Sequence, residues 1–233
     1  MVDLSAEMAE LWASLGAPAA GAGRLVQFIA ARRAEGTSTV AREFAHFAAR
    51  RAGRSVWLVD LDLLRSAQHA AIAADTERYG PLSAPAGASP DGSAFFTVRP
   101  PAPDAEGRPV PDAAWLSAHQ VGAGRLWVTR FQRQALQGGR SVHVLPTPDY
   151  WRALRAHVDL VIVDSPAADR SQAGLTVAPH MDQTVLVVAA DQADVAAPAR
   201  LKDALHGAGG HVAGLFFNRG QVEAPAFLKA LLP

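Results

Sequence analysis

Residues 28–40 read Phe-Ile-Ala-Ala-Arg-Arg-Ala-Glu-Gly-Thr-Ser-Thr-Val and lead from a short apolar run, residues 25–30, into a segment of helical periodicity, residues 40–51. We expect the apolar run to be a strand and the periodic segment to be a helix. A strand-to-helix junction presents backbone N–H groups and a helix N-terminus to anionic oxygens. The sequence therefore indicates a candidate phosphate-binding loop between these two elements.

The alternation of strand and helix continues on both sides of this junction. An amphipathic helix is expected at residues 5–15, either packed on the domain or free to dock a partner, and a Gly/Ala/Pro linker follows it. Further strands are expected at residues 55–60, 159–164, 184–190 and 211–218, and further helices at residues 171–178, 195–207 and 224–232. Near-continuous apolar strands separated by helices are typical of a parallel sheet covered on both faces. We therefore predict a doubly wound α/β domain at residues 24–233, preceded by a helix and linker at residues 1–23.

A proline-rich segment at about residues 80–148 interrupts this alternation. It contains three β-rich pieces, at residues 95–99, 126–131 and 142–145. Long segments of this kind inside a compact domain are usually functional or inserted. We expect an insertion that carries extra strands and serves as a lid or partner surface, because its prolines break it too often for a core of its own.

The composition excludes several classes of protein. Lys and Arg (22) balance Asp and Glu (22), so the strong positive field of a nucleic-acid-binding or lipid-binding protein is missing. The absence of cysteine excludes disulfides, thiolate metal sites and a cysteine nucleophile, and the eight histidines show no metal-ligand spacing. No signal peptide and no apolar run of membrane-spanning length is found, so we expect a cytoplasmic protein without direct membrane insertion.

The loop at residues 31–39 matches a phosphate-binding motif only in part. The full pattern is G-x-x-x-x-G-K-[ST], in which Lys reaches the β- and γ-phosphates and Ser or Thr ligates Mg²⁺. Gly36 and Ser38 stand where the motif requires them, whereas Ala31 replaces the first Gly and Thr37 replaces the Lys. Taken alone, the stretch Gly-Thr-Ser-Thr could equally be a helix N-cap.

Polar residues end three of the predicted strands. The sequence Ser-Val-Trp-Leu-Val-Asp-Leu-Asp ends in Asp60 and Asp62, Asp-Leu-Val-Ile-Val-Asp ends in Asp164, and Val-Ala-Gly-Leu-Phe-Phe-Asn ends in Asn218. The carboxyl ends of parallel strands meet at one edge of the sheet, where ligands bind in open α/β folds. Each residue alone could be a cap or turn residue, but the three acids in this order favour a nucleotide site.

The order of these segments resembles that of a known group. EGxST, LVDLD, DLVIVDSPA and GLFFNR, spread over residues 25–219 apart from the proline-rich middle, look like the motifs of the MinD/ParA class of deviant P-loop ATPases. Within that class the pattern is most similar to the cytoplasmic tyrosine kinase domains of bacterial capsular and exopolysaccharide systems. It also resembles degenerate kinase-like proteins of exopolysaccharide and holdfast operons. The resemblance implies a P-loop NTPase-like fold and binding of ATP or ADP with Mg²⁺.

The resemblance also implies a role for each matching residue. Gly36, Thr37, Ser38 and Thr39, with the neighbouring Glu35, would line the phosphate loop, and Ser38 and Asp164 would hold Mg²⁺. Asp60 and Asp62 would be the catalytic acids that orient the attacking group or the water on the metal. Asn218 and Arg219 would lie at the base pocket.

The departures from the family pattern concern charge and phosphorylation. Thr37 cannot supply the positive charge that phosphoryl transfer needs, so catalysis should suffer more than nucleotide binding. Arg32, at the position of a second lysine in some relatives, or the adjacent Arg33 could compensate. A pocket plugged by either arginine or by Glu35 would instead favour a pure scaffold. The sequence has only two tyrosines, so we expect no tyrosine tail, and the helix at residues 5–15 lacks the arginines of a ring-forming kinase helix.

Three functions remain open on this evidence. The first is a degenerate kinase-like regulator or scaffold of exopolysaccharide or holdfast assembly, held at the inner membrane by a partner such as a polysaccharide co-polymerase, with a homodimer as a further option. The second is a working ATPase or tyrosine kinase that uses Arg32 or Arg33 in place of the lysine. The third is a partitioning or positioning switch of the ParA or MinD kind, against which the neutral charge counts.

Overall fold

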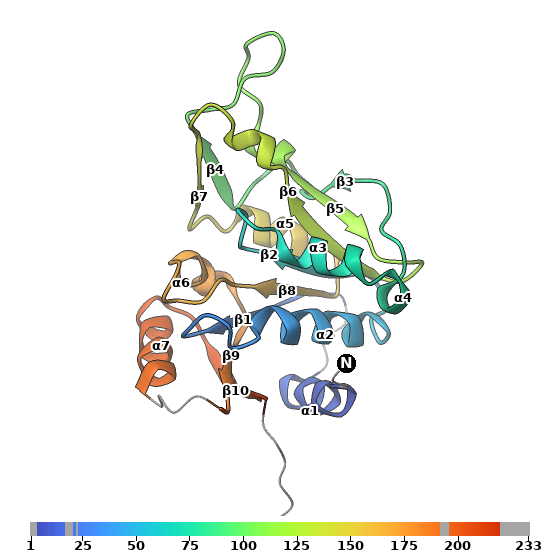
Figure 1. Ribbon diagram of the computed structural model, residues 1–233, viewed down its shortest axis with the longest axis vertical. Coiled ribbons are helices and arrows are strands. Elements are labelled where there is room, and N and C mark those ends of the chain that lie inside the picture. Colours follow the sequence, from blue (N-terminus) through green and yellow to red (C-terminus); the bar gives the residue numbers. More distant parts are fainter. Residues whose placement is uncertain (1–3, 17–20, 22, 192–195, 220–233) are drawn as a thin grey trace, which may run out of the picture.

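Six parallel strands form the centre of an eight-stranded sheet (Figure 1). The structure is a computed structural model that describes residues 4–16, 21, 23–191 and 196–219. The strands of this sheet are β1 (Arg24–Ala30), β2 (Val56–Asp60), β3 (Ala86–Gly87), β5 (Leu116–Gln120), β6 (Leu126–Phe131), β8 (Leu160–Asp164), β9 (Gln183–Ala189) and β10 (Val212–Asn218). Their order is β10-β9-β1-β8-β2-β6-β5-β3, parallel as far as β6 and antiparallel beyond it. The predicted mostly parallel α/β sheet is confirmed.

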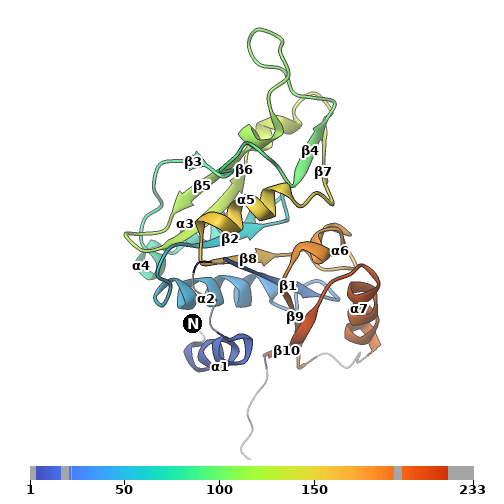
Figure 2. The ribbon, with the colours of Figure 1, turned by 180° about the vertical axis from the view of Figure 1, so that it is seen from behind.

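Helices cover both faces of this sheet. They are α1 (Ser5–Leu15), α2 (Thr37–Ala49), α3 (Ala67–Ala74), α4 (Thr76–Tyr79), α5 (Asp149–His157), α6 (Ala173–Val177) and α7 (Ala196–Gly207), with short 3₁₀ turns η1 (Asp112–Trp115), η2 (Arg133–Leu136) and η3 (Ala178–His180). Figure 1 shows α2 and α3 in front of the sheet, and Figure 2 shows α5 on the opposite face. The doubly wound arrangement expected from the sequence is therefore present.

The side chains of β1 show why the two faces differ. Val26 and Phe28 belong to the core under α2, whereas Ile29 belongs to the core that also contains residues of α7. This alternation follows from the two-residue period of a strand. On the outer side of α2, the indole of Trp12 from α1 lies 6.1 Å from the ring of Phe44, so α1 packs on the domain.

The proline-rich segment adds strands to the sheet and a separate hairpin. β6 pairs in parallel with β2, and β5 pairs with β6, so this part of the segment extends the main sheet. β4 (Phe96–Arg99) and β7 (Ser141–Val144) pair only with each other. Phe95 and Phe96 pack with Tyr150 and Trp151 in one buried cluster with the back of the sheet, so the segment shares the domain core.

Several elements differ from the sequence expectation. The helix α5 was not expected, because the prolines before it suggest a loop; it is stabilised by burial of Tyr150, Trp151 and Leu154. The helix α3 was not expected either, because its alanine-rich sequence has no amphipathic stripe, although alanine favours helix wherever the chain allows it. The helix expected at residues 224–232 lies outside the described residues.

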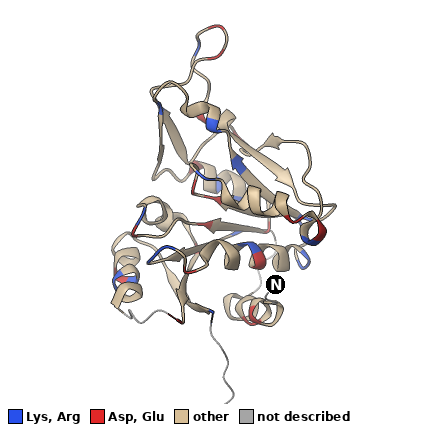
Figure 3. Ribbon diagram, in the orientation of Figure 1, with Lys and Arg blue, Asp and Glu red and all other residues tan. Residues whose placement is uncertain are grey.

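Two surface properties bear on the expected environment. Within the described residues, none of the helices has the length and apolar character needed to cross a membrane. Figure 3 shows acidic and basic segments intermixed over the ribbon, in keeping with the net charge of zero.

Candidate functional site

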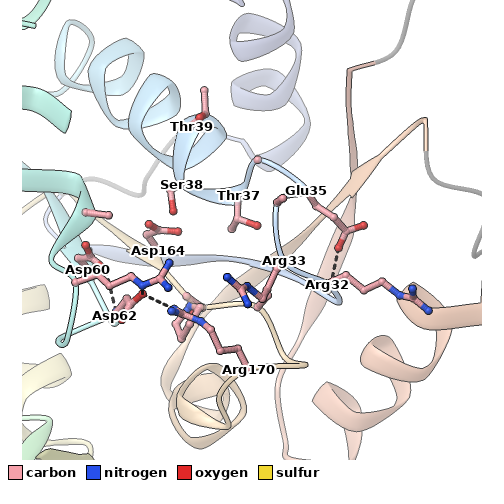
Figure 4. Close-up of a pocket in the computed structure, with 17 residues that line it drawn as sticks. Arg32, Arg33, Glu35, Thr37, Ser38, Thr39, Asp60, Asp62, Asp164 and Arg170 are labelled. Atoms are coloured by element: carbon pink, nitrogen blue, oxygen red, sulfur yellow. Dashed lines mark hydrogen bonds and ion pairs between the residues drawn. The ribbon is translucent and has the colours of Figure 1, made fainter. Parts of the chain in front are cut away.

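A cavity of about 380 Å³ lies at the carboxyl ends of β1, β8 and β2, which are neighbours in the sheet (Figure 4). Its wall is formed by the loop at residues 32–39 and by parts of the segments that follow β2 and β8. The strand order brings these three segments together, as the sequence predicted for ligand-binding strand ends. The loop predicted to bind phosphate and the three acids Asp60, Asp62 and Asp164 therefore line one cavity.

The loop between β1 and α2 turns sharply at Gly36. Gly36 has φ +90°, and the N–H groups of Thr39 and Val40 bond to its carbonyl oxygen at 3.0 Å, which starts α2. A Cβ atom at Gly36 would lie 2.0 Å from the side-chain nitrogen of Asn218. Both the left-handed backbone and this close approach require glycine. Ala34 also has a positive φ, +64°, a strained conformation held by the contacts around it.

Three residues predicted for the nucleotide site, of which Glu35 lines the cavity, make contacts that support this loop. The buried carboxylate of Glu35 accepts hydrogen bonds from the backbone N–H groups of Arg32 at 2.7 Å and Ala189 at 3.4 Å. Asn218 donates from its side chain to the Glu35 carbonyl at 2.8 Å, and Arg219 donates to the Ala34 carbonyl at 2.7 Å. Asn218 and Arg219 are not among the residues that line the cavity, and they tie the end of β10 to the back of the loop.

Asp60 and Asp164 lie side by side because they are register partners across β2 and β8. Both are 3% exposed. Gln68, near the start of α3, connects them: its backbone N–H donates to Asp60 Oδ2 at 3.0 Å, and its Nε2 donates to Asp164 Oδ2 at 2.6 Å. The same Nε2 donates to the Ser38 carbonyl at 2.8 Å, so Gln68 also links the acids to the phosphate loop.

Burial disfavours the ionised form of both acids. Burial, and then the neighbouring charge of Asp164, raises the pKa of Asp60 to about 8, against the hydrogen bonds that Asp60 accepts from Gln68 and Asp62. Burial likewise raises the pKa of Asp164 to about 6, although hydrogen bonds from Ser38 and Gln68 oppose the shift. Two adjacent carboxylates in a site of low dielectric share a proton unless a cation neutralises them. The pair therefore favours the binding of a cation beside it.

The arginines of the site divide into two groups. Arg32 extends away from the acids toward α7, whereas Arg33 points into the cavity below Thr37 (Figure 4). Arg170, from the segment after β8, forms an ion pair with Asp62, and Arg65 Nε lies 4.0 Å from the same carboxylate.

The sequence predicted neither Arg170 nor Gln68. Their place in the sequence could have indicated both residues, because each follows soon after a strand that ends in an aspartate.

Solved structures of known proteins share this arrangement of strands. The kinase domain of the Escherichia coli tyrosine kinase ETK superposes with a TM-score of 0.54 at 16% identity, covering 88% of this chain and 70% of that one. The chimerical protein CapA2B2 gives 0.55 at 14% identity, covering 86% and 78%. MinD from Pyrococcus horikoshii OT3, complexed with Mg-ADP, gives 0.52 at 14%, covering 90% and 77%. The chain has the fold of these kinase and MinD domains. No protein-family model and no curated sequence matches it.

The residues of this P-loop fold suit a Mg-nucleotide, with one exception. Asp164 Oδ1 is buried and has no hydrogen-bond partner among the described residues, so it is an acceptor available to a metal-bound water. Ser38, at the start of α2, lines the same cavity. The described residues contain no cluster of three or more acidic or histidine side chains that could hold a metal alone, so Mg²⁺ would depend on phosphate oxygens and water. The exception is Thr37, which is 8% exposed and uncharged.

Proposed function

We propose that this chain is a nucleotide-binding, kinase-like P-loop protein that has lost most of its catalytic capacity and acts as a regulator or scaffold. The observation that carries the proposal is the combination of a formed cavity with an uncharged Thr37 at the lysine position. The backbone of the loop and the N-terminus of α2 can still bind phosphate. The positive charge that stabilises the transferring phosphoryl group is absent, because Thr37 stands where such loops carry a lysine.

The proposed ligand is ATP or ADP with Mg²⁺, bound more weakly than in a lysine-containing loop. The N–H groups of Thr37 and Ser38 would contact the phosphates, and Ser38 with Asp164 would hold Mg²⁺. A lysine in this place makes charge-assisted hydrogen bonds worth about 1.5–3 kcal/mol each. Binding is expected to persist because the backbone donors do not depend on that side chain.

The two tyrosines of the sequence bear on autophosphorylation. Tyr150 is fully buried in the aromatic cluster, and Tyr79 is 8% exposed. The Tyr79 hydroxyl donates to Glu43 Oε1 at 2.6 Å and accepts from Arg42 Nε at 3.2 Å. Because both side chains are buried in the folded chain, we expect neither hydroxyl to be a site of autophosphorylation.

The proposed cellular role is in exopolysaccharide or holdfast assembly, through a membrane partner such as a polysaccharide co-polymerase. The support is the similarity of the motifs to the tyrosine kinase domains of capsular and exopolysaccharide systems, together with the kinase-domain fold. A cytoplasmic chain held peripherally at the inner membrane by this partner fits the absence of a spanning helix in the described part. Co-purification of the chain with a co-polymerase from membranes would test the role.

An active ATPase or kinase is the second candidate, and one observation favours it. Arg33 points into the cavity, and its guanidinium has no partner among the described residues (Figure 4). Arg33 could therefore carry some of the missing charge. Arg32 is a weaker candidate for this task because its side chain extends toward α7.

Calorimetric titration and a turnover assay separate the two candidates. Wild type should bind Mg-ATP and Mg-ADP but hydrolyse ATP slowly or not at all. Thr37→Lys should tighten Mg-ATP binding by about tenfold or more, the factor that 1.4 kcal/mol gives. Thr37→Met is the matched control, because it adds comparable bulk without charge and should not tighten binding. Rapid hydrolysis by wild type that Arg33→Ala abolishes would contradict the proposal in favour of the active enzyme.

A further inference from the structure

We propose that Arg170 supplies the phosphate-binding charge that the loop lacks, and that Asp62 competes with the phosphate for it. This inference rests on the proposed nucleotide binding. It concerns a residue outside the phosphate-loop sequence, in the segment between β8 and α6.

The backbone around Arg170 is attached to the start of the phosphate loop. The N–H groups of Ala168 and Asp169 donate to the carbonyls of Ala30 and Ala31, at 3.0 and 3.2 Å. In return, Arg33 N–H donates to Asp169 Oδ2 at 3.3 Å. The segment therefore holds a fixed position beside the loop, and Arg170 lines the same cavity as Thr37 and Asp164.

The side chain of Arg170 is half-buried and engaged with Asp62. The two side chains are 28% and 17% exposed, and Figure 4 shows the guanidinium between Asp62 and Arg33, on the cavity side of the loop. A partly buried guanidinium is screened less than an exposed one. Its planar group of donors also suits two oxygens of a phosphate at once. Arg170, whose guanidinium already faces a carboxylate at the cavity, is therefore placed to bind a phosphate there.

Asp62 can release Arg170 without being left alone. Arg65 Nε already lies 4.0 Å from the Asp62 carboxylate, and Arg65 is exposed enough to move closer. Exchange of Arg170 from Asp62 to a phosphate would replace one ion pair by another and leave Asp62 paired. Because Asp62 lies between two arginines, the exchange costs little free energy.

An arginine away from the cavity gives the matched control. Arg152, on α5, has a side chain that is 70% exposed, and it is not among the residues that line the cavity. Truncation of Arg152 should therefore leave the phosphate subsite intact, which makes Arg152→Ala the matched control for Arg170→Ala.

The test is calorimetric titration of the full chain with Mg-ATP, Mg-ADP, AMP and inorganic tripolyphosphate. Arg170→Ala should weaken Mg-ATP and tripolyphosphate binding by about tenfold or more and AMP binding by much less. Arg170→Lys should retain part of the affinity. Asp62→Asn should tighten Mg-ATP binding by about threefold or more, because it removes the competitor, and this gain should vanish in the Asp62→Asn/Arg170→Ala double variant. Arg152→Ala should stay within about twofold of wild type.

The outcomes distinguish the inference from the function on which it rests. Wild type that binds none of the nucleotides would overturn the proposed function. Wild type that binds nucleotide, with Arg170→Ala unchanged or Arg152→Ala weakened equally, would overturn this inference alone. Weaker binding by Asp62→Asn would overturn the competition. Thermal melting of each variant without ligand shows whether it is folded, and Arg170→Lys, which keeps the ion pair with Asp62, gives the decision if the alanine variant unfolds.

Discussion

The buried pair Asp60–Asp164 should make the protein less stable as pH rises through neutrality. The pKa of Asp60 is raised to about 8 in the folded chain by burial and by Asp164, whereas an unfolded aspartate has its ordinary value near 3.8. Between these values the folded state binds more protons than the unfolded state, so the unfolding free energy falls with increasing pH. The slope for one excess proton is about 1.4 kcal/mol per pH unit.

Asp60→Asn removes the carboxyl group that binds the extra proton of the folded state. Between pH 6 and pH 8, where Asp164, with a pKa of about 6, has largely released its own proton, wild type should lose about 2–3 kcal/mol of stability. The variant should lose far less. Asparagine has one acceptor in place of the two that bind Asp62 N–H and Gln68 N–H, so it costs about 1–2 kcal/mol at every pH. The pH slope, rather than the stability at one pH, is therefore the quantity to compare.

Urea unfolding followed by tryptophan fluorescence at pH 6, 7 and 8, without divalent cations, measures this slope. The exposed Asp203 on α7 gives the matched control, since Asp203→Asn should leave the slope unchanged. If Asp60→Asn keeps the wild-type slope, the two carboxylates do not share a proton and the electrostatic account of the site is wrong. Added Mg-ATP should also reduce the wild-type slope, because the bound cation favours the ionised pair.

Two further variants test how the site is held together. Gln68→Leu removes the side-chain hydrogen bonds to Asp164, Ser38 and Arg42 and leaves the buried carboxylate of Asp164 without the Gln68 donor. Urea unfolding should therefore show a loss of about 2–4 kcal/mol in unfolding free energy. The control Gln134→Leu, at an exposed position, should show almost none. Asn218→Ala removes the donor to the Glu35 carbonyl, so amide hydrogen exchange in residues 31–36 should accelerate while exchange in the core of β8 stays slow; unchanged exchange in the loop would show that Asn218 does not hold it.

The sequence predicted the elements in which local pattern and burial agree. The strands β2, β8 and β9 have continuous apolar runs, and β1 has an apolar run interrupted only by the buried Gln27. The ends of β2 and β8 lie at the cavity, as predicted. The strand β5, Leu-Ser-Ala-His-Gln, carries no such run, and it is held by pairing with β6 and β3. Pairing of this kind depends on residues distant in sequence, which a local pattern cannot show.

The candidate site was predicted at the level of segments and missed at the level of side-chain direction. The loop and the acids Asp60, Asp62 and Asp164 share one cavity, as their order implied. The directions of Arg32 and Asn218 follow from contacts that no motif records. Glu35 holds the Arg32 backbone, and the crowding of Asn218 against Gly36 places that amide behind the loop.

The position of the positive charge separates nucleotide binding from catalysis in this site. Under the proposed function, nucleotide binding would depend on backbone donors at the start of α2, whose geometry is fixed by Gly36 and by the contacts behind the loop. Phosphoryl transfer also requires a cation held against the reacting phosphate, because charge develops there in the transition state. In the site proposed here, Arg170 lines the cavity but is paired with Asp62, so it would exchange partners before contacting a phosphate. A lysine that extends from the loop itself would have no such competitor, and this difference would make a site that binds nucleotide more readily than it hydrolyses it.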